Sequence, residues 1–244
     1  MKSYLFVQVL LVSFFFSCYN DKDYDSINVN IDNVLKIQPY KTTVFANGRD
    51  TVILKVELPT EAADNLSQVT FSTTRGSFVE SDKKEYQASA KLVKINGENK
   101  RIALAKFKSD ISVGTAYIKI AILDFEKNIE IETQRNYASS VEVIPATFAI
   151  NAGAFTELEI VTKLRSDNGQ VSKGQKVMVA AFDDGNSPIG RFRVKNDLSN
   201  ENEECSFIYS LVPDTLFKGK LIITATAIGS PSTTSGSTEI FVIK

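Results

Sequence analysis

The sequence predicts an all-β protein built from two β-sandwiches, and two observations lead to this prediction. Apolar and polar residues alternate with a period of two in many short segments rich in Val, Ile, Thr, Phe and Tyr, as strands with one buried face require. Turn-forming dipeptides such as Asn47-Gly48, Asn96-Gly97 and Asn168-Gly169 separate these segments. Long helical patterns do not alternate with the predicted strands, so sandwiches are favoured over a parallel α/β sheet.

The first residues have the pattern of a secretory signal peptide. A cation at Lys2 precedes an almost entirely apolar segment from Tyr4 to Phe16. At about 1.5 Å per residue, a helix of this length spans about 20 Å, which is short of the roughly 30 Å hydrocarbon core of a bilayer. We therefore expect a cleaved leader at residues 1–17 rather than a transmembrane helix.

The segment Phe15-Phe16-Ser17-Cys18 resembles the lipobox of bacterial lipoproteins, in which apolar residues and a small residue precede the cysteine that is acylated. The resemblance implies lipidation of Cys18 by chains such as palmitate, and several acyl chains give a stable membrane anchor. The alternative is an ordinary signal peptide that happens to end at a cysteine. Residues 18–33 are expected to form a polar tether. Acidic residues behind Cys18 resemble the surface-export signal of Bacteroidota-type lipoproteins, and a solvated linker is the equal alternative.

Composition limits the chemistry that the chain can perform. The sequence contains no histidine, which excludes Ser-His and Cys-His nucleophile activation and histidine-ligated zinc. Its 28 basic and 29 acidic residues form no basic run, so we expect no nucleic-acid partner. Hydrolysis by two carboxylates stays open. Because no phosphate-binding glycine loop or nucleophile motif occurs, the sequence predicts no enzyme, no cofactor and no metal.

Residues 34–144 are expected to form the first sandwich. A strand at Thr51–Leu58, a strand and glycine turn at Val69–Gly76, and a closing strand that begins Gly114-Thr115-Ala116 follow one another in the sequence. This order is similar to that of the bacterial immunoglobulin-like domains of invasin- and intimin-type surface proteins. The resemblance implies an immunoglobulin-like fold and carries no active site with it.

Residues 145–244 are expected to form a second immunoglobulin-like sandwich. We place the boundary at Pro145, because proline interrupts a central strand. Strands at Glu157–Leu164, Lys176–Phe182 and Lys220–Ile228 resemble the same family more weakly, since Val-Ala-Ala-Phe replaces Val-Thr-Phe. The sequence thus predicts tandem immunoglobulin-like sandwiches.

Three connecting segments are predicted to lie outside the main strands. Phe125–Tyr137 is longer than the family pattern needs, and we interpret it as an additional hairpin. Lys94–Arg101 is expected to be an exposed hairpin tip, because Asn96-Gly97 supplies positive φ angles. Gly229–Gly236 is expected to be a flexible turn between the last two strands.

Three polar or reactive groups are candidate sites with an ordinary structural alternative. Cys205 alternates with Phe207 and Tyr209, so a small buried side chain is favoured over a reactive thiol. Asp183–Ser187 offers the oxygen ligands that Ca²⁺ prefers, although ordinary turn chemistry is the favoured interpretation. The acidic run Asn200–Glu204 is interpreted as a solvated loop rather than a catalytic carboxylate pair.

Together these predictions favour a non-catalytic, membrane-anchored surface lipoprotein that acts as a binding, adhesion or structural module. Its expected partners are the membrane, through the lipid at Cys18, and a protein or glycan contacted through loops or strand edges. The expected location is the outer membrane facing the cell surface, with the periplasmic face as the alternative. The other functions considered are an accessory scaffold of an outer-membrane glycan-uptake or secretion complex, and a carboxylate-dependent glycoside hydrolase.

Overall fold

The structure, a computed structural model, describes residues 35–60, 67–152, 157–211, 217–229 and 233–243. Every regular element in these ranges is a strand, which confirms the all-β prediction. None of the described residues forms a helix that could cross a membrane. The predicted leader, Cys18 and the predicted tether lie outside the described residues.

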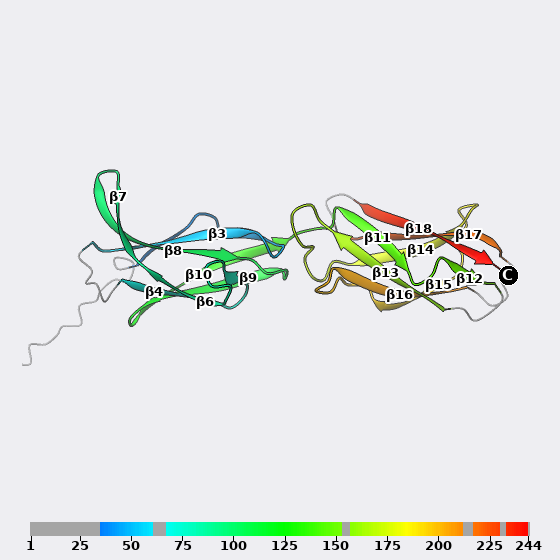
Figure 1. Cartoon of the computed structure of the whole chain (residues 1–244), viewed down its shortest axis with the longest axis horizontal. Helices are drawn as coiled ribbons and strands as arrows, with labels where there is room; N and C mark the ends of the chain where they lie inside the picture. The colour runs from blue at the N-terminus through cyan, green and yellow to red at the C-terminus, as the bar shows by residue number, and fades with distance from the viewer. Residues whose placement is uncertain (1–34, 61–66, 153–156, 212–216, 230–232, 244) are drawn as a thin grey trace, which may run out of the picture.

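The first sandwich is formed by two sheets that pack face to face (Figure 1). One sheet has the order β1-β3-β8-β5, with β7 also paired to β8, and the other has the order β2-β10-β9-β4-β6. The strands are β1 (Lys36–Pro39), β2 (Thr43–Ala46), β3 (Thr51–Leu58), β4 (Gln68–Thr73), β5 (Ser77–Phe78), β6 (Glu85–Ser89), β7 (Lys91–Ile95), β8 (Glu98–Lys108), β9 (Gly114–Ile122) and β10 (Phe125–Arg135).

The second sandwich repeats this topology. Its sheets have the orders β11-β13-β16-β15 and β12-β18-β17-β14, and in both sandwiches the short second strand pairs in parallel with the last strand. The tandem prediction is therefore confirmed although the second half lacks the Val-Thr-Phe signature. The strands are β11 (Ser140–Pro145), β12 (Ala149–Asn151), β13 (Glu157–Arg165), β14 (Val177–Asp183), β15 (Arg191–Asn196), β16 (Glu204–Ser210), β17 (Gly219–Ala227) and β18 (Thr234–Ile243).

The boundary between the sandwiches falls at residues 136–139, before β11, and not after Ile144 as predicted. Strand β11 pairs with β13 of the second sandwich, with Pro145 opposite Ile160. The proline ends an edge strand just before the chain crosses to the other sheet, and Pro39 holds the equivalent place at the end of β1. Proline is tolerated there because it cannot donate to a ladder. Pro145 therefore lies at the end of the first strand of the second sandwich, whereas the sequence predicts that it ends the first sandwich.

Two further segments differ from their predictions. Phe125–Arg135 is not an additional hairpin, because β10 pairs with β9 along its length and with β2, and so closes the first sandwich. Strand β18 already begins at Thr234, so the turn expected to reach Gly236 ends earlier. A Cβ atom at Gly236 would lie 1.8 Å from the carbonyl oxygen of Val141, so only glycine permits this approach of β18 to β11.

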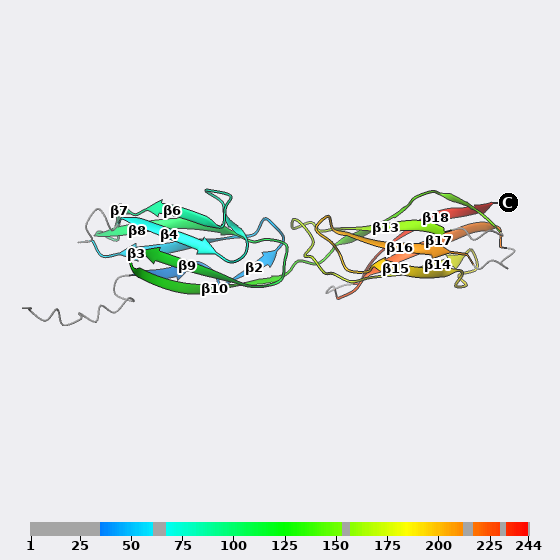
Figure 2. The same ribbon diagram turned by 90° about the horizontal axis from the view of Figure 1, so that it is seen from below.

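Each sandwich has its own apolar core, as the alternating patterns require. Strand β3 shows the pattern clearly, since Val52, Leu54, Val56 and Leu58 are all buried. The Asn96-Gly97 tip has positive φ angles of 51° and 88° and connects Ile95 to Glu98 across the hairpin, as predicted. The two cores lie end to end along the long axis of the molecule (Figures 1 and 2).

Candidate functional site

The two sandwiches are connected by a loop of the second sandwich, residues 166–176, that binds the end of the first. The backbone amide of Gln170 donates a hydrogen bond to the carbonyl oxygen of Asn47 at 3.0 Å. The amide of Lys173 donates to the carbonyl oxygen of Ile111 at 2.8 Å. These bonds link backbone groups of different domains, and we call this region the interdomain joint.

Ser172 lies fully buried at the centre of the interdomain joint. Its hydroxyl donates to the carbonyl oxygen of Ala46 at 2.7 Å and accepts from the amide of Asn136 at 2.8 Å. The amide of Ser172 in turn donates to the carbonyl oxygen of Asn136 at 3.0 Å. Because Asn136 belongs to the linker after β10, one serine holds the linker and the first sandwich to the same loop.

Asn47 forms the matching contact from the first sandwich. Its Oδ1 accepts hydrogen bonds from the amides of Arg49 at 2.9 Å and Asp50 at 2.7 Å. Its Nδ2 donates to the carbonyl oxygen of Asn168 at 2.6 Å. The neighbouring Gly169 has a φ of +102°, and a Cβ atom there would lie 3.0 Å from the carbonyl oxygen of Asn47. The close approach of the two domains therefore depends on glycine at this position.

Further buried polar side chains extend the network into the second sandwich. The side-chain Oε1 of Gln175 accepts a hydrogen bond from the backbone amide of Ala138 at 3.0 Å. The backbone amide of Gln175 donates to the hydroxyl of Ser199 at 2.9 Å. That hydroxyl donates to the carbonyl oxygen of Ser172 at 3.1 Å. Hydrogen bonds excluded from water are costly to break, because the separated groups would be left buried and unpaired.

Large apolar side chains are exposed at the end of the second sandwich that lies farthest from the first (Figure 1). The exposed fractions are 62% for Phe148, 52% for Phe241 and 49% for Ile243. Phe241 and Ile243 share the outward face of β18, and the amide of Phe241 donates to the carbonyl oxygen of Phe148 at 2.9 Å. We call these three residues the apolar tip.

The apolar tip has the composition of a protein-contact surface. Large apolar side chains that are exposed at one end of a sandwich often mark binding sites. Lys220, opposite Phe241 in the sheet register, forms an ion pair of 3.1 Å with Glu239. The hydrogen bond to Glu239 raises the pKa of Lys220. Apolar groups beside a paired charge resemble the centre and rim of an interface.

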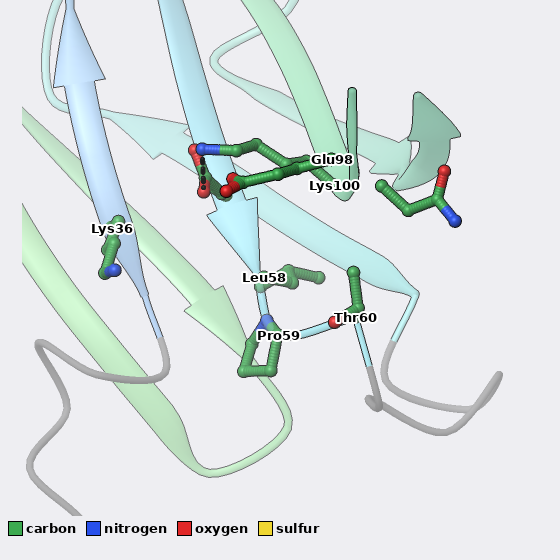
Figure 3. A pocket seen from close by; sticks show the side chains of 8 residues that line it. Lys36, Leu58, Pro59, Thr60, Glu98 and Lys100 are labelled. Atoms are coloured by element: carbon green, nitrogen blue, oxygen red, sulfur yellow. Dashed lines mark ion pairs between the residues drawn. The ribbon is translucent and has the colours of Figure 1, made fainter. Parts of the chain in front are cut away.

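A polar hollow lies at the opposite end of the molecule, where β3 ends. Its volume is about 380 Å³. Lys36 of β1 and Glu98 and Lys100 of β8 line it together with the Leu58-Pro59 segment (Figure 3). Lys100 forms an ion pair with Glu57 at 3.1 Å, and this hydrogen bond holds the pKa of Glu57 below its usual value. The hollow lies beside the first described residues of the chain.

A second hollow, of about 530 Å³, borders the interdomain joint. It is lined from the first sandwich by Lys108 and Asp110 and from the second by Gln170, Lys173 and Glu201. Lys173 and Glu201 form an ion pair of 3.1 Å. The hollow is therefore lined by charged side chains from both sandwiches.

The predicted burial of Cys205 is confirmed. Its side chain is 1% exposed and faces the core with Phe207 and Tyr209. Burial raises the pKa of the Cys205 thiol to about 11, so the thiol stays protonated at neutral pH. The residue fills space in the core.

The two acidic segments form turns. Oδ1 of Asp183 accepts hydrogen bonds from the amides of Gly185 at 2.9 Å and Ser187 at 2.8 Å. In the second segment, Oδ1 of Asn200 accepts from the amide of Glu204 at 2.9 Å. Among the described residues, no group of His, Cys, Asp or Glu side chains gathers as metal ligands would.

Comparison with known proteins identifies solved structures of similar fold. No protein-family model and no curated sequence matches the chain. The adhesin InvE of Yersinia pseudotuberculosis superposes with a TM-score of 0.51 at 16% identity, over 87% of this chain and 61% of that one. Invasin, a bacterial integrin-binding protein, superposes with a TM-score of 0.58 at 14% identity, over 86% of this chain and 39% of that one. The chain thus spans less than two thirds of either structure.

At such identities the likeness concerns the fold. The described residues have the fold of tandem immunoglobulin-like sandwiches, as the sequence resemblance implies.

The hydrogen bonds of the interdomain joint predict different losses of stability when Asn47 and Asn168 are each replaced by Ala. Replacing Asn47 by Ala leaves the carbonyl oxygen of Asn168 and the amides of Arg49 and Asp50 without partners, and should cost about 1–3 kcal/mol of unfolding free energy. Asn168→Ala keeps the backbone carbonyl that Asn47 binds and should cost less than about 0.5 kcal/mol. Denaturant unfolding of both variants tests this. Equal losses would contradict the role assigned to Asn47.

Proposed function

We propose that the chain is a non-catalytic surface lipoprotein in which a lipid at Cys18 anchors a stiff rod and the apolar tip binds a partner. The observation that carries the proposal is the position of the apolar tip, at the end of the second sandwich that lies farthest from the first. An anchor before residue 35 places that end farthest from the membrane. The interdomain joint supports the proposal, because a fixed joint holds the tip at a constant distance from the anchor.

The anchor is supported by the lipobox-like segment Phe15–Cys18. From Cys18 to Asn33, an extended chain spans roughly 55 Å at about 3.5 Å per residue. A tether of this length lets the rod project beyond the lipid headgroups. The outer membrane, with the sandwiches facing the cell surface, is the location that fits these features.

A surface binding role is also supported by the fold neighbours. InvE is described as an adhesin and invasin as an integrin-binding protein. The apolar tip favours a protein or glycan partner with an apolar surface of its own, because most of the free energy of such a contact comes from a few buried aromatic side chains.

The anchor is tested by metabolic labelling with palmitate. The wild-type chain should incorporate label and Cys18→Ala should not, because the second cysteine, Cys205, is buried in the core. Protease treatment of intact cells should then degrade the wild-type sandwiches. Label retained in Cys18→Ala would contradict the anchor, and full protection from protease would place the rod on the periplasmic face.

The binding role is tested with the double variant Phe148→Ser/Phe241→Ser. Partners found for the wild-type chain on glycan and extracellular-protein arrays should bind this variant at least about tenfold more weakly. The control Tyr40→Ser removes an exposed aromatic side chain from the first sandwich, 74% exposed, and should bind as the wild type does. Release of reducing sugar from any glycan on the array would contradict the non-catalytic proposal.

A further inference from the structure

The register of the first sandwich gathers lysines that are scattered in the sequence. On the outer face of the sheet formed by β1, β3, β8 and β7, residues paired across strands lie on the same side, and so do residues two apart along a strand. We call this surface the lysine face. Its cations are Lys36, Lys55, Lys91, Lys100, Lys106 and Lys108.

Part of this positive charge has no compensating carboxylate. Glu57 binds both Lys55, at 3.5 Å, and Lys100, at 3.1 Å, and Asp82 binds Lys108 at 2.7 Å. Within the described part of the chain, Lys36, Lys91 and Lys106 form no ion pair. The lysine face also exposes Ile53 and Leu104, which lie on neighbouring strands between the lysines.

The other outer face of the same sandwich has the opposite charge. Along β10 the outward side chains include Glu126, Glu130 and Glu132, and Glu85 of β6 points to the same side. Lys119 pairs with Glu126, while Glu130, Glu132 and Glu85 form no ion pair with another described residue. Tyr117, opposite Glu130 in the register, is exposed. We call this surface the glutamate face.

The separation of charge is specific to the first sandwich. In the second sandwich, outward charges of β11, β13, β15 and β16 neutralise one another within one sheet. The pairs are Arg165–Glu142 at 2.9 Å, Arg193–Glu157 at 3.3 Å, Lys195–Glu159 at 2.7 Å and Lys163–Glu204 at 3.6 Å. Cross-strand pairing of this kind is the ordinary arrangement of charges on a sheet, so the first sandwich departs from it on both faces.

We propose that copies of this chain associate side by side, with the lysine face of one copy against the glutamate face of the next. Each face places exposed apolar groups, Ile53 and Leu104 on one and Tyr117 on the other, among charges of which one sign is in excess, so contact buries the apolar groups and pairs the excess charges. Because the two faces differ and lie on opposite sides of the sandwich, the contact is heterologous and generates an open row rather than a closed dimer.

The association is weak between free molecules, because exposed ion pairs are screened within about 8 Å at physiological ionic strength. Association at a membrane surface rests on the proposed anchor at Cys18. Copies held by their N-termini in one membrane have a high effective concentration. Because all copies are anchored in the same way, the lysine face of one copy and the glutamate face of the next lie at the same distance from the membrane.

The test uses two charge-reversal variants of the full chain, kept in non-ionic detergent with micelles in excess. Lys91→Glu/Lys106→Glu replaces two of the cations of the lysine face that form no ion pair by carboxylates, and Glu130→Lys/Glu132→Lys replaces two of the carboxylates of the glutamate face that form no ion pair by cations. In sedimentation velocity the wild type should associate at about 0.02 M salt and dissociate at about 1 M. Each variant alone should associate at least about tenfold more weakly, and an equimolar mixture of the two should recover association.

A matched control distinguishes the effect of charges on the two faces from the effect of the net charge of the chain. Lys163→Glu/Lys195→Glu makes the same change of net charge on the second sandwich and should associate as the wild type does. A wild type that stays monomeric at low salt, or a mixture no more associated than its components, would overturn the proposal. These measurements do not depend on lipidation, so they fail or succeed independently of the anchor. Thermal unfolding of each variant confirms that it is folded.

Discussion

The hydrogen bonds of the interdomain joint determine how this molecule can act. Ser172 and Asn47 bind backbone groups of the other domain away from water, and the glycine at Gly169 allows the two backbones to approach. Two sandwiches on a flexible linker would present their surfaces independently. With the joint formed, the charged faces of the first sandwich and the apolar tip of the second keep one orientation relative to each other.

The strands were largely predictable from the sequence, because a half-buried strand must alternate and β3 and β9 do so clearly. The order of elements was harder. The sequence predicts that Pro145 ends the first sandwich, because proline interrupts a central strand. Proline does not indicate, however, to which sandwich the edge strand before it belongs. The sequence predicts a hairpin at Phe125–Tyr137 because the segment is longer than the family pattern needs, whereas the structure uses it for β10, which pairs with β9 and β2.

The functional surfaces were less predictable than the fold. Burial of Cys205 followed from local alternation with its neighbours, which a sequence displays directly. The joint left a weak signal, the dipeptides Asn47-Gly48 and Asn168-Gly169, which are also ordinary turns. The lysine face left none, because register brings together residues such as Lys36 and Lys91 that are isolated in the chain. Only pairing between distant strands reveals this face.

These features combine into a rod with distinct sides and distinct ends. Hydrogen exchange of the joint amides in the full chain tests the stiffness of the rod most directly. The amides of Gln170, Ser172 and Lys173, each bound to a carbonyl oxygen of the first sandwich or its linker, should exchange as slowly as core amides of β9. Exchange as fast as that of the exposed Asn96-Gly97 tip would show that the sandwiches move independently and would contradict the account.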